Sequence, residues 1–297
     1  LSFLQSASEQ EDKFFRQYLG TSLQAAKGSF NQEMFKRIYH PEQDILISYI
    51  LSILGQALRS NYYSQPIKNW GVHKKKDLLN IEEQNLFCKI YTYSARTMGL
   101  MPAPNVYLRA DQALGMRNAN ADPAAVIIGG DVRQKAVDRE LCFIVSKTLC
   151  WMLPQHYLGS VGYPTEFLKM LFMAMMDLTD PSLGIGQTLG EQGDVVKREI
   201  SAIPAQLQMQ VQKAMKQYLA KGENPNLSQW VTSCEHTAIR MGLLLSGDIH
   251  TAANCIKNDT MPLGKAGVKE KIREMVLFSI SNEYFQLRED LGLAIGK

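Results

Sequence analysis

Helical periodicity governs most of this chain of 297 residues. Apolar residues recur every three or four positions, a spacing that places them on one face of an α-helix. The segments with this pattern are residues 11–23, 32–39, 43–59, 81–98, 139–152, 167–178, 205–221, 227–246, 248–257, 268–279 and 282–295. Asn80 precedes the fourth segment as its expected N-cap. The pattern predicts a predominantly helical protein, and its first four segments predict a helical N-terminal layer.

Two short segments with a different amino-acid composition interrupt the helical pattern. Residues 102–109 and 124–130 are rich in β-branched or aromatic side chains and are bounded by Pro, Gly, Asn and Asp, which is typical of strands. Residues 113–123 between them form an expected polar turn. We therefore expect an α+β fold, predominantly helical, with a small β-sheet or hairpin inserted after the N-terminal helices. We divide the chain into an N-terminal helical layer, residues 1–80, and a domain of residues 81–297 that forms one compact unit with it.

Charge, hydropathy and cysteine usage narrow the classes of function. The net charge of +3 is spread along the chain, so we expect no nucleic-acid partner, and the basic run at residues 74–76 is typical of a solvated turn. The longest apolar stretches, residues 45–58 and 167–176, are shorter than a bilayer-spanning helix, so we expect no membrane contact. Five cysteines without a C-x-x-C pair indicate reduced thiols and a cytoplasmic location. The start Leu-Ser-Phe, without methionine, predicts that the chain is part of a longer protein or has a processed start.

Several motifs between residues 80 and 260 occur in a characteristic order. They are Gly-Leu-Met-Pro-Ala-Pro-Asn-Val-Tyr-Leu at 99–108, Asn-Ala-Asn at 118–120, Val-Ile-Ile-Gly at 126–129, a helix at 140–153, and Glu-x-x-Ala beginning at Glu235. This order resembles the catalytic domain of the gluzincin zinc metallopeptidases, which include the CAAX prenyl protease and the HtpX heat-shock protease. The resemblance implies that fold, with the helix at 140–153 in the place of the zinc helix and Glu235 in the place of the third zinc ligand.

The residues expected to bind zinc depart from that family. The H-E-x-x-H motif works because two imidazoles four residues apart share one helix face and the glutamate serves as general base. In this alignment the motif falls on Ser146-Lys147-Thr148-Leu149-Cys150, and Ile239 replaces a supporting aspartate. A serine hydroxyl is a poor zinc ligand, and a lysine ammonium has donors only. We therefore predict former metal-site positions at Ser146, Lys147, Cys150 and Glu235, with no catalytic residue, no bound metal and no cofactor.

A buried carboxylate at Glu235 would need a partner or a proton. If the inherited geometry persists, Lys147 supplies the positive charge that zinc would have supplied and pairs with Glu235 across two helices. Ser146 and Cys150 have a simpler interpretation, as small residues on the buried face of a helix.

Other candidate sites carry weaker patterns. Cys150 with His156 or His236 could form a thiol hydrolase, although His156 is expected in a loop and no third orienting group is visible. The glycine-rich residues 183–193 lack the Gly-Lys-Ser/Thr ending of a phosphate loop and are expected to be a connection between helices. Four methionines at positions 170–176 indicate adaptable core packing or, if exposed, a protein-binding groove.

The function expected from these observations is that of a non-catalytic, metallopeptidase-like (pseudo-protease) domain. Its partner would be a protein or another region of the same longer chain, with a scaffolding or regulatory effect. Degenerate domains of this kind resemble modules attached to tetratricopeptide-type repeats in large bacterial proteins. The alternatives are a hydrolase with a relocated active site based on Cys150, and a small-molecule sensor that uses the former substrate cleft.

Overall fold

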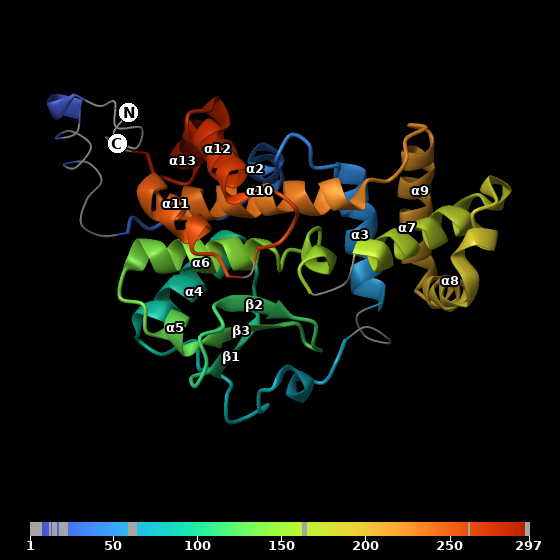
Figure 1. Ribbon diagram of the computed structural model, residues 1–297, viewed down its shortest axis with the longest axis horizontal. Coiled ribbons are helices and arrows are strands. Elements are labelled where there is room, and N and C mark those ends of the chain that lie inside the picture. Colours follow the sequence, from blue (N-terminus) through green and yellow to red (C-terminus); the bar gives the residue numbers. More distant parts are fainter. Residues whose placement is uncertain are drawn as a thin grey trace.

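The structure, a computed structural model, describes residues 8–11, 13, 17, 23–58, 64–161, 165–260 and 262–294. It is predominantly helical with one three-stranded sheet, which confirms the coarse fold class (Figure 1). Most of the helix expected at residues 11–23 lies outside the described residues. No described helix has the length and apolar character needed to cross a membrane.

Twelve α-helices with defined bounds and three short 3-10 helices make up the helical part of the described chain. The α-helices are α2 Gln32–Ile38, α3 Ile45–Leu58, α4 Leu86–Thr97, α5 Gly130–Arg133, α6 Asp138–Cys150, α7 Thr165–Thr179, α8 Gly186–Ser201, α9 Ala205–Leu219, α10 Leu227–Ser246, α11 Ile249–Lys257, α12 Val268–Ser279 and α13 Asn282–Asp290. The 3-10 helices are η3 Ile67–Trp70, η4 Tyr157–Gly159 and η5 Pro181–Leu183.

Local capping explains why the bounds of α10 agree with the sequence pattern. The Asn226 side chain accepts a hydrogen bond from the Gln229 backbone N–H at its start. At its end Gly247 adopts φ 67°, a left-handed conformation that glycine adopts without steric cost. Asp248 then caps α11 by accepting from the His250 N–H, as its position predicts.

Two expectations about helix bounds were wrong. α4 begins at Leu86 rather than residue 81, because the Asn85 side chain, and not that of Asn80, caps it by accepting from the Cys88 N–H. The glycine-rich residues 183–193 are not merely a connection, since most of them belong to α8. Gly190, at φ 62° and ψ −169°, kinks that helix, so the glycine signal marked a bend inside a helix.

The sheet consists of β1 Asn105–Arg109, β2 Met116–Ala119 and β3 Ala125–Gly129 in the order β1-β3-β2. β1 runs parallel to β3, and β2 runs antiparallel to it. β1 and β3 confirm the two predicted strands. β2 lies within residues 113–123, which were expected to be a turn, and it makes the sheet three-stranded instead of a hairpin.

The two faces of the sheet are both covered. Val106, Val126 and Ile128 point into the main core beneath α6. Tyr107 and Ile127 point to the opposite face, where they form a smaller cluster with residues near η3. Successive side chains of a strand point to opposite faces of the sheet. Because both faces are covered, β1 and β3 have nearly continuous apolar sequences.

The centre of the molecule is the contact between α6 and α10, which lie one above the other in Figure 1. Almost every side chain of α10 is buried. The earlier helices do not form a layer of their own: α2 packs on α13, α3 on α9 and α4 on α6. The N-terminal helices therefore contribute to the same core as the later helices.

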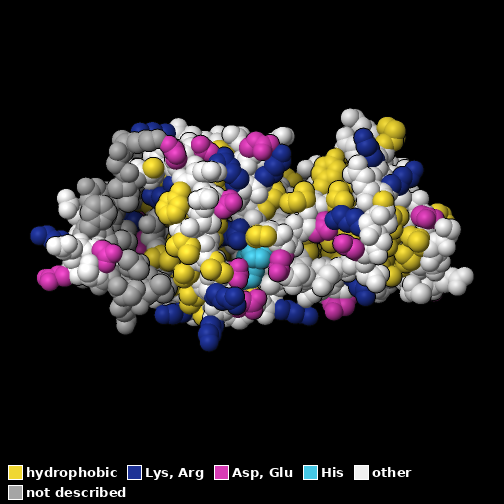
Figure 2. Space-filling model, turned by 90° about the horizontal axis from the view of Figure 1, so that it is seen from above, with side chains coloured by type: hydrophobic (Ala, Val, Ile, Leu, Met, Phe, Trp, Pro, Cys, Tyr) yellow, Lys and Arg dark blue, Asp and Glu magenta, His cyan; other side chains and the backbone are white. Residues whose placement is uncertain are grey.

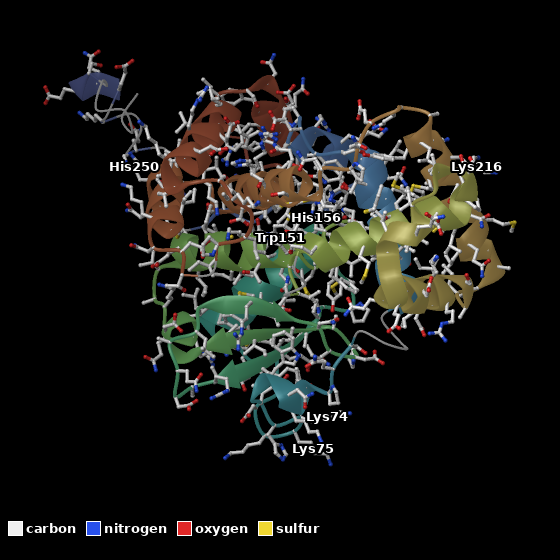
Figure 3. All side chains as sticks on the ribbon, turned by 45° about the vertical axis from the view of Figure 1, so that its right-hand side comes forward. Lys74, Lys75, Trp151, His156, Lys216 and His250 are labelled. Carbon is white, nitrogen blue, oxygen red and sulfur yellow. The ribbon has the colours of Figure 1, made fainter. Side chains whose placement is uncertain are left out.

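α7, α8 and α9 form a lobe on the right of Figure 1. Met175 and Met176 on α7 are buried among these helices, which confirms the interpretation of the methionine-rich segment as core packing. Basic and acidic side chains are interspersed over the face seen in Figure 2, as expected for charge spread along the chain. Lys74 and Lys75 are exposed in a turn, and Figure 3 shows them projecting from the lower edge of the molecule.

Candidate functional site: a buried ion cluster between α6, α10 and α12

Glu235 lies in the middle of α10 with no exposed surface. The Lys147 Nζ atom of α6 is 3.0 Å from its Oε1 atom, and the Lys271 Nζ atom of α12 is 2.9 Å from the same oxygen. The Trp151 indole Nε1–H donates to the other carboxylate oxygen over 3.0 Å. The predicted pair between Lys147 and Glu235 is therefore confirmed, and two further donors share the carboxylate.

A second carboxylate completes the arrangement. Asp259, in the segment after α11, lies 2.7 Å from the Lys147 ammonium. Lys271 also donates to the Leu263 carbonyl oxygen over 3.3 Å. Two ammonium groups thus face two carboxylates, so their formal charges cancel inside the fold. We call Lys147, Trp151, Glu235, Asp259 and Lys271 the Glu235 cluster.

Glu235 and Lys147 keep their charges at neutral pH. Burial raises the pKa of Glu235, but the nearby Lys147 and Lys271 ammonium groups outweigh burial and lower it below its usual value. For Lys147, burial lowers the pKa, while Glu235 and Asp259 outweigh this effect and raise the pKa above its usual value. Each charge therefore stays buried because an opposite charge compensates it.

The structure changes which residues of α6 face Glu235. Ser146, one of the expected positions, points toward α4, where its Oγ atom is 3.0 Å from that of Ser94. Lys147 and Trp151 contact the carboxylate instead, and they are four residues apart. Side chains four apart share one helix face, whereas neighbours differ by about 100°. The face that meets Glu235 is therefore one residue further along the helix than the motif alignment placed it.

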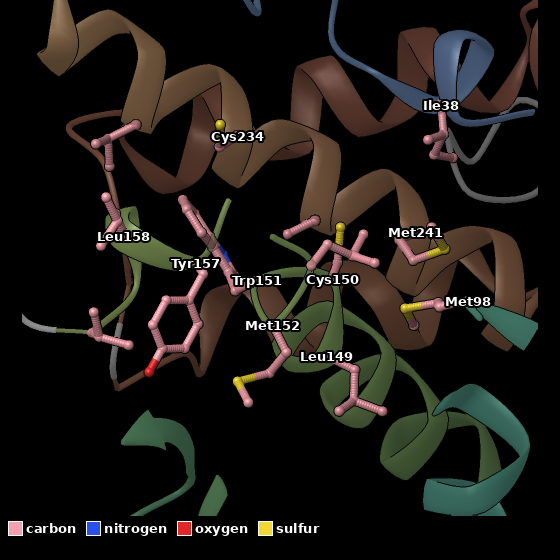
Figure 4. Packing of buried hydrophobic residues seen from close by; sticks show 14 of the residues in the cluster. Ile38, Met98, Leu149, Cys150, Trp151, Met152, Tyr157, Leu158, Cys234 and Met241 are labelled. Atoms are coloured by element: carbon pink, nitrogen blue, oxygen red, sulfur yellow. The ribbon is translucent and has the colours of Figure 1, made fainter. Parts of the chain in front are cut away.

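Cys150, the other expected position on α6, lies inside the core. Figure 4 shows it among buried side chains between α6 and α10. Both Ser146 and Cys150 are fully buried, which confirms their interpretation as small residues on a buried helix face. Ile239 is buried on α10 as well.

His156 lies in the turn between α6 and η4, as expected, and it is fully buried there. Its Nδ1 atom is 3.7 Å from the Cys150 Sγ atom. The Gln43 amide donates to the His156 Nε2 atom over 2.9 Å, so Nδ1 carries the proton and donates to the Cys150 carbonyl oxygen. Burial raises the pKa of the Cys150 thiol and lowers the pKa of His156 to about 4. A neutral thiol beside a ring nitrogen that already carries a proton is not an activated nucleophile.

His236 does not join Cys150. It projects from another side of α10, and its ring lies 4.9 Å from that of His40. Burial, and then the neighbouring His40, lower the pKa of His236. Its Nε2 atom is 3.9 Å from the Glu270 carboxylate.

The Glu235 cluster has little capacity to hold a metal ion. Lysine ammonium and indole N–H groups are donors and offer no lone pair. Among the residues that the structure describes, no group of three His, Cys, Asp or Glu side chains is arranged to bind a metal. The arrangement can fix three helices relative to one another and can present the Lys147 ammonium to a neighbouring cavity.

Sequence reasoning missed three members of the cluster. Lys271 carried a usable signal, because it occupies the buried face of α12 with Met275 and Phe278, where a charge requires a buried partner. Trp151 is four residues after Lys147 and so shares its face. Asp259 follows α11 without a local signal, since only the path of the chain brings it to Lys147.

No protein-family model matches the chain, and neither a curated protein nor a solved structure matches it. The resemblance to the gluzincin peptidases stays a prediction.

Proposed function

We propose that this chain is a non-catalytic, metallopeptidase-like domain that acts by binding a protein, either a separate partner or another region of a longer chain. The observation that carries the proposal is the Glu235 cluster. If α6 stands in the place of a zinc helix, Lys147 and Trp151 occupy the two ligand positions, and both offer donors where zinc needs lone pairs.

The second ammonium group strengthens this reasoning. Lys271 neutralises Glu235 from α12, so the carboxylate is already satisfied by partners of the protein itself. A site that binds zinc keeps its carboxylate available for the metal. The contact between α6, α10 and α12 instead stabilises the packing of these helices. This role suits a module that binds its partner through its surface.

Exposed apolar side chains near the C-terminal end supply a surface for such a module. Leu277 of α12, Ile280 directly after α12 and Phe285 of α13 are 48%, 69% and 57% exposed. Large apolar side chains that are solvent-exposed and close together in the chain are typical of protein contact sites. Their position on helices that also contact α10 and α2 would link partner binding to the centre of the fold.

Metal analysis and peptide cleavage test the non-catalytic part. We expect protein purified without chelator to hold no stoichiometric zinc and to cleave no peptide. Stoichiometric zinc that is lost in Glu235→Ala would overturn the proposal.

A designed variant tests the likeness to a metallopeptidase. Lys147→His, Thr148→Glu and Trp151→His together create H-E-x-x-H on the face that meets Glu235, and Lys271→Met frees the carboxylate. We expect this variant to bind one zinc ion and to melt at higher temperature when zinc is added. The same motif built one residue earlier, with Ser146→His, Lys147→Glu and Cys150→His, is the matched control and should not bind zinc through Glu235. Equal binding by both versions would contradict the geometry.

A capture experiment tests the binding part. The domain serves as bait, and Ile280→Asp with Phe285→Asp should remove most of the captured protein. Met209→Asp on α9 is the control, because Met209 is 65% exposed and lies on a different lobe. Equal capture by all three baits would show that this surface is not the contact site, and no captured protein from the source cells would contradict the binding role.

The alternative of a Cys150-based hydrolase receives less support from the geometry. The thiol has no exposed surface and a raised pKa, and no described group orients His156 as a base toward it. A thiol-directed covalent inhibitor that labels Cys150 in the folded protein would revive this alternative.

A further inference from the structure

A cavity of about 150 Å³ lies beside the Glu235 cluster. Its wall comes from the start of β2, from α5 and α6, and from the segment that follows α11. These elements lie together on the left of the molecule in Figure 1. Met116, Val132 and Phe143 supply an apolar part of the wall, and all three side chains are buried. We call it the Lys147 cavity, because the Lys147 side chain lines it from the interior.

Two ion pairs line the same cavity. Lys135 and Glu140 lie 2.6 Å apart, with 26% and 34% of their side chains exposed. Lys147 and Asp259 lie 2.7 Å apart, with 14% and 20% exposed. The cavity therefore offers two ammonium groups and two carboxylates in ion pairs next to an apolar wall. The chain segments that carry them are different, so the arrangement depends on the tertiary fold. A third carboxylate, that of Asp131, also lines the cavity; it is exposed and accepts from the Gly115 backbone N–H.

We propose that the Lys147 cavity binds a zwitterionic ligand of the size of a free amino acid. The ligand's carboxylate would accept from the Lys135 or Lys147 ammonium, and its own ammonium would donate to Asp259 or Glu140. Its side chain would lie against the apolar wall at Phe143.

The charge pattern favours a zwitterion over a simple anion or cation. An anionic ligand that binds the lysine of either ion pair leaves the carboxylate of that pair without a partner. A cationic ligand that binds the carboxylate leaves the lysine without one. An unpaired charge in a partly buried site is costly. A zwitterion supplies one group of each sign, so both members of an opened ion pair find a new partner.

The volume of the cavity indicates the size of the ligand. About 150 Å³ corresponds to the share of roughly five water molecules in the liquid. Sites for drug-sized ligands and cofactors measure about 300–1,000 Å³. A free amino acid with a short apolar side chain matches this volume, whereas a nucleotide would extend out of it.

Glu235 acts in this site as a positioning residue. It has no exposed surface and holds the Lys147 ammonium over 3.0 Å from the side away from solvent. Asp259 can therefore turn to a ligand's ammonium while Lys147 keeps one buried partner. This inference goes beyond the proposed protein-binding function and does not depend on it.

The test begins with the full chain and the twenty free L-amino acids, screened by thermal shift at millimolar concentration. Isothermal titration calorimetry then compares the strongest binder with its N-acetyl and carboxamide derivatives. We expect each derivative to bind at least about tenfold more weakly, because each removes one charge of the zwitterion. Equal binding of either derivative, or no binding by any of the twenty, would overturn the proposal.

Two kinds of variant locate the binding. Lys135→Met and Asp259→Asn should each weaken binding at least about tenfold, since each removes a charged partner. Thr148→Phe should abolish binding by filling the cavity, because Thr148 lines it and is only partly buried. Lys216→Met on α9 is the control and should bind as the unmodified chain does. Melting curves of every variant confirm folding, and unchanged binding in folded Thr148→Phe protein would place the ligand elsewhere.

Discussion

Replacing Lys147 by methionine should lower the free energy of unfolding by about 3 kcal/mol at pH 7. Methionine has a similar length and no charge, so the variant removes the ammonium group with little change in packing. Glu235 is fully buried and would keep Lys271 and Trp151 as donors. Breaking a buried ion pair costs about 3–5 kcal/mol, and the remaining donors place this variant at the lower end of that range.

The pH dependence separates lost charge pairing from lost packing. The Lys147 ammonium lowers the pKa of Glu235 from its usual value of 4.5. That stabilisation is present above pH 4.5 and is lost as the pH falls through the lowered pKa of the folded state. The pKa of Lys147 is raised above 10.5, so its charge persists through the alkaline range up to that value. The difference between the variant and the unmodified chain should therefore be constant from about pH 6 to 9 and shrink below pH 4.5.

Urea unfolding followed by circular dichroism measures this difference at each pH, and calorimetry should show a fall in melting temperature of about 6 °C. Lys216→Met is the matched control, because Lys216 is exposed on α9, and it should change stability by less than about 0.5 kcal/mol. A loss below about 1 kcal/mol for Lys147→Met, or a loss that does not vary with pH, would refute the electrostatic reasoning.

Three further predictions concern the core around the cluster. Gly242→Ala should destabilise the fold by about 2 kcal/mol in urea unfolding, because a Cβ atom there would lie 2.8 Å from the Phe143 ring, while Gly267→Ala, in open space, should not. The Cys150 thiol should react with Ellman's reagent only after unfolding, since burial raises its pKa, and rapid reaction in native buffer would contradict this. His156 should make the fold sensitive to acid: its pKa is about 4 in the fold and 6.5 when unfolded, so stability should fall by about 3 kcal/mol between those pH values. The variant His156→Gln should remove that part of the slope, and an unchanged slope would show that other groups cause it.

Local signals predicted most helices and two of the three strands. The bounds of α10 and α12 follow from apolar spacing and from residues that end a helix, such as Gly247. The errors also have local causes. Asn85 competes successfully with Asn80 as the cap of α4, and β2 is a polar strand whose pairing partner lies further along the chain. β2 is stabilised mainly by its pairing with β3, so its own residues show only a weak preference for a strand.

The candidate site was predictable only in part. The pair of Lys147 and Glu235 was predicted by placing a cation and an anion on helices expected to face each other, and the structure confirms it at 3.0 Å. Ser146 was assigned to the same face, but it lies against α4. An error of one residue turns a helix by about 100°, which here is the difference between facing α10 and facing α4.

The amino-acid sequence alone was enough to predict most of the helical segments, the lack of an H-E-x-x-H motif on α6, and the charges that a buried Glu235 would require. These properties depend on side chains within a few positions of one another, and local hydrogen bonds and periodicity encode them. The rotation of α6 relative to α10, and the presence of Lys271 and Asp259 in the cluster, depend on the three-dimensional fold. The rotation of a helix about its axis is decided by core packing, here by the close approach of Gly242 to Phe143, and such contacts join residues that are far apart in the chain.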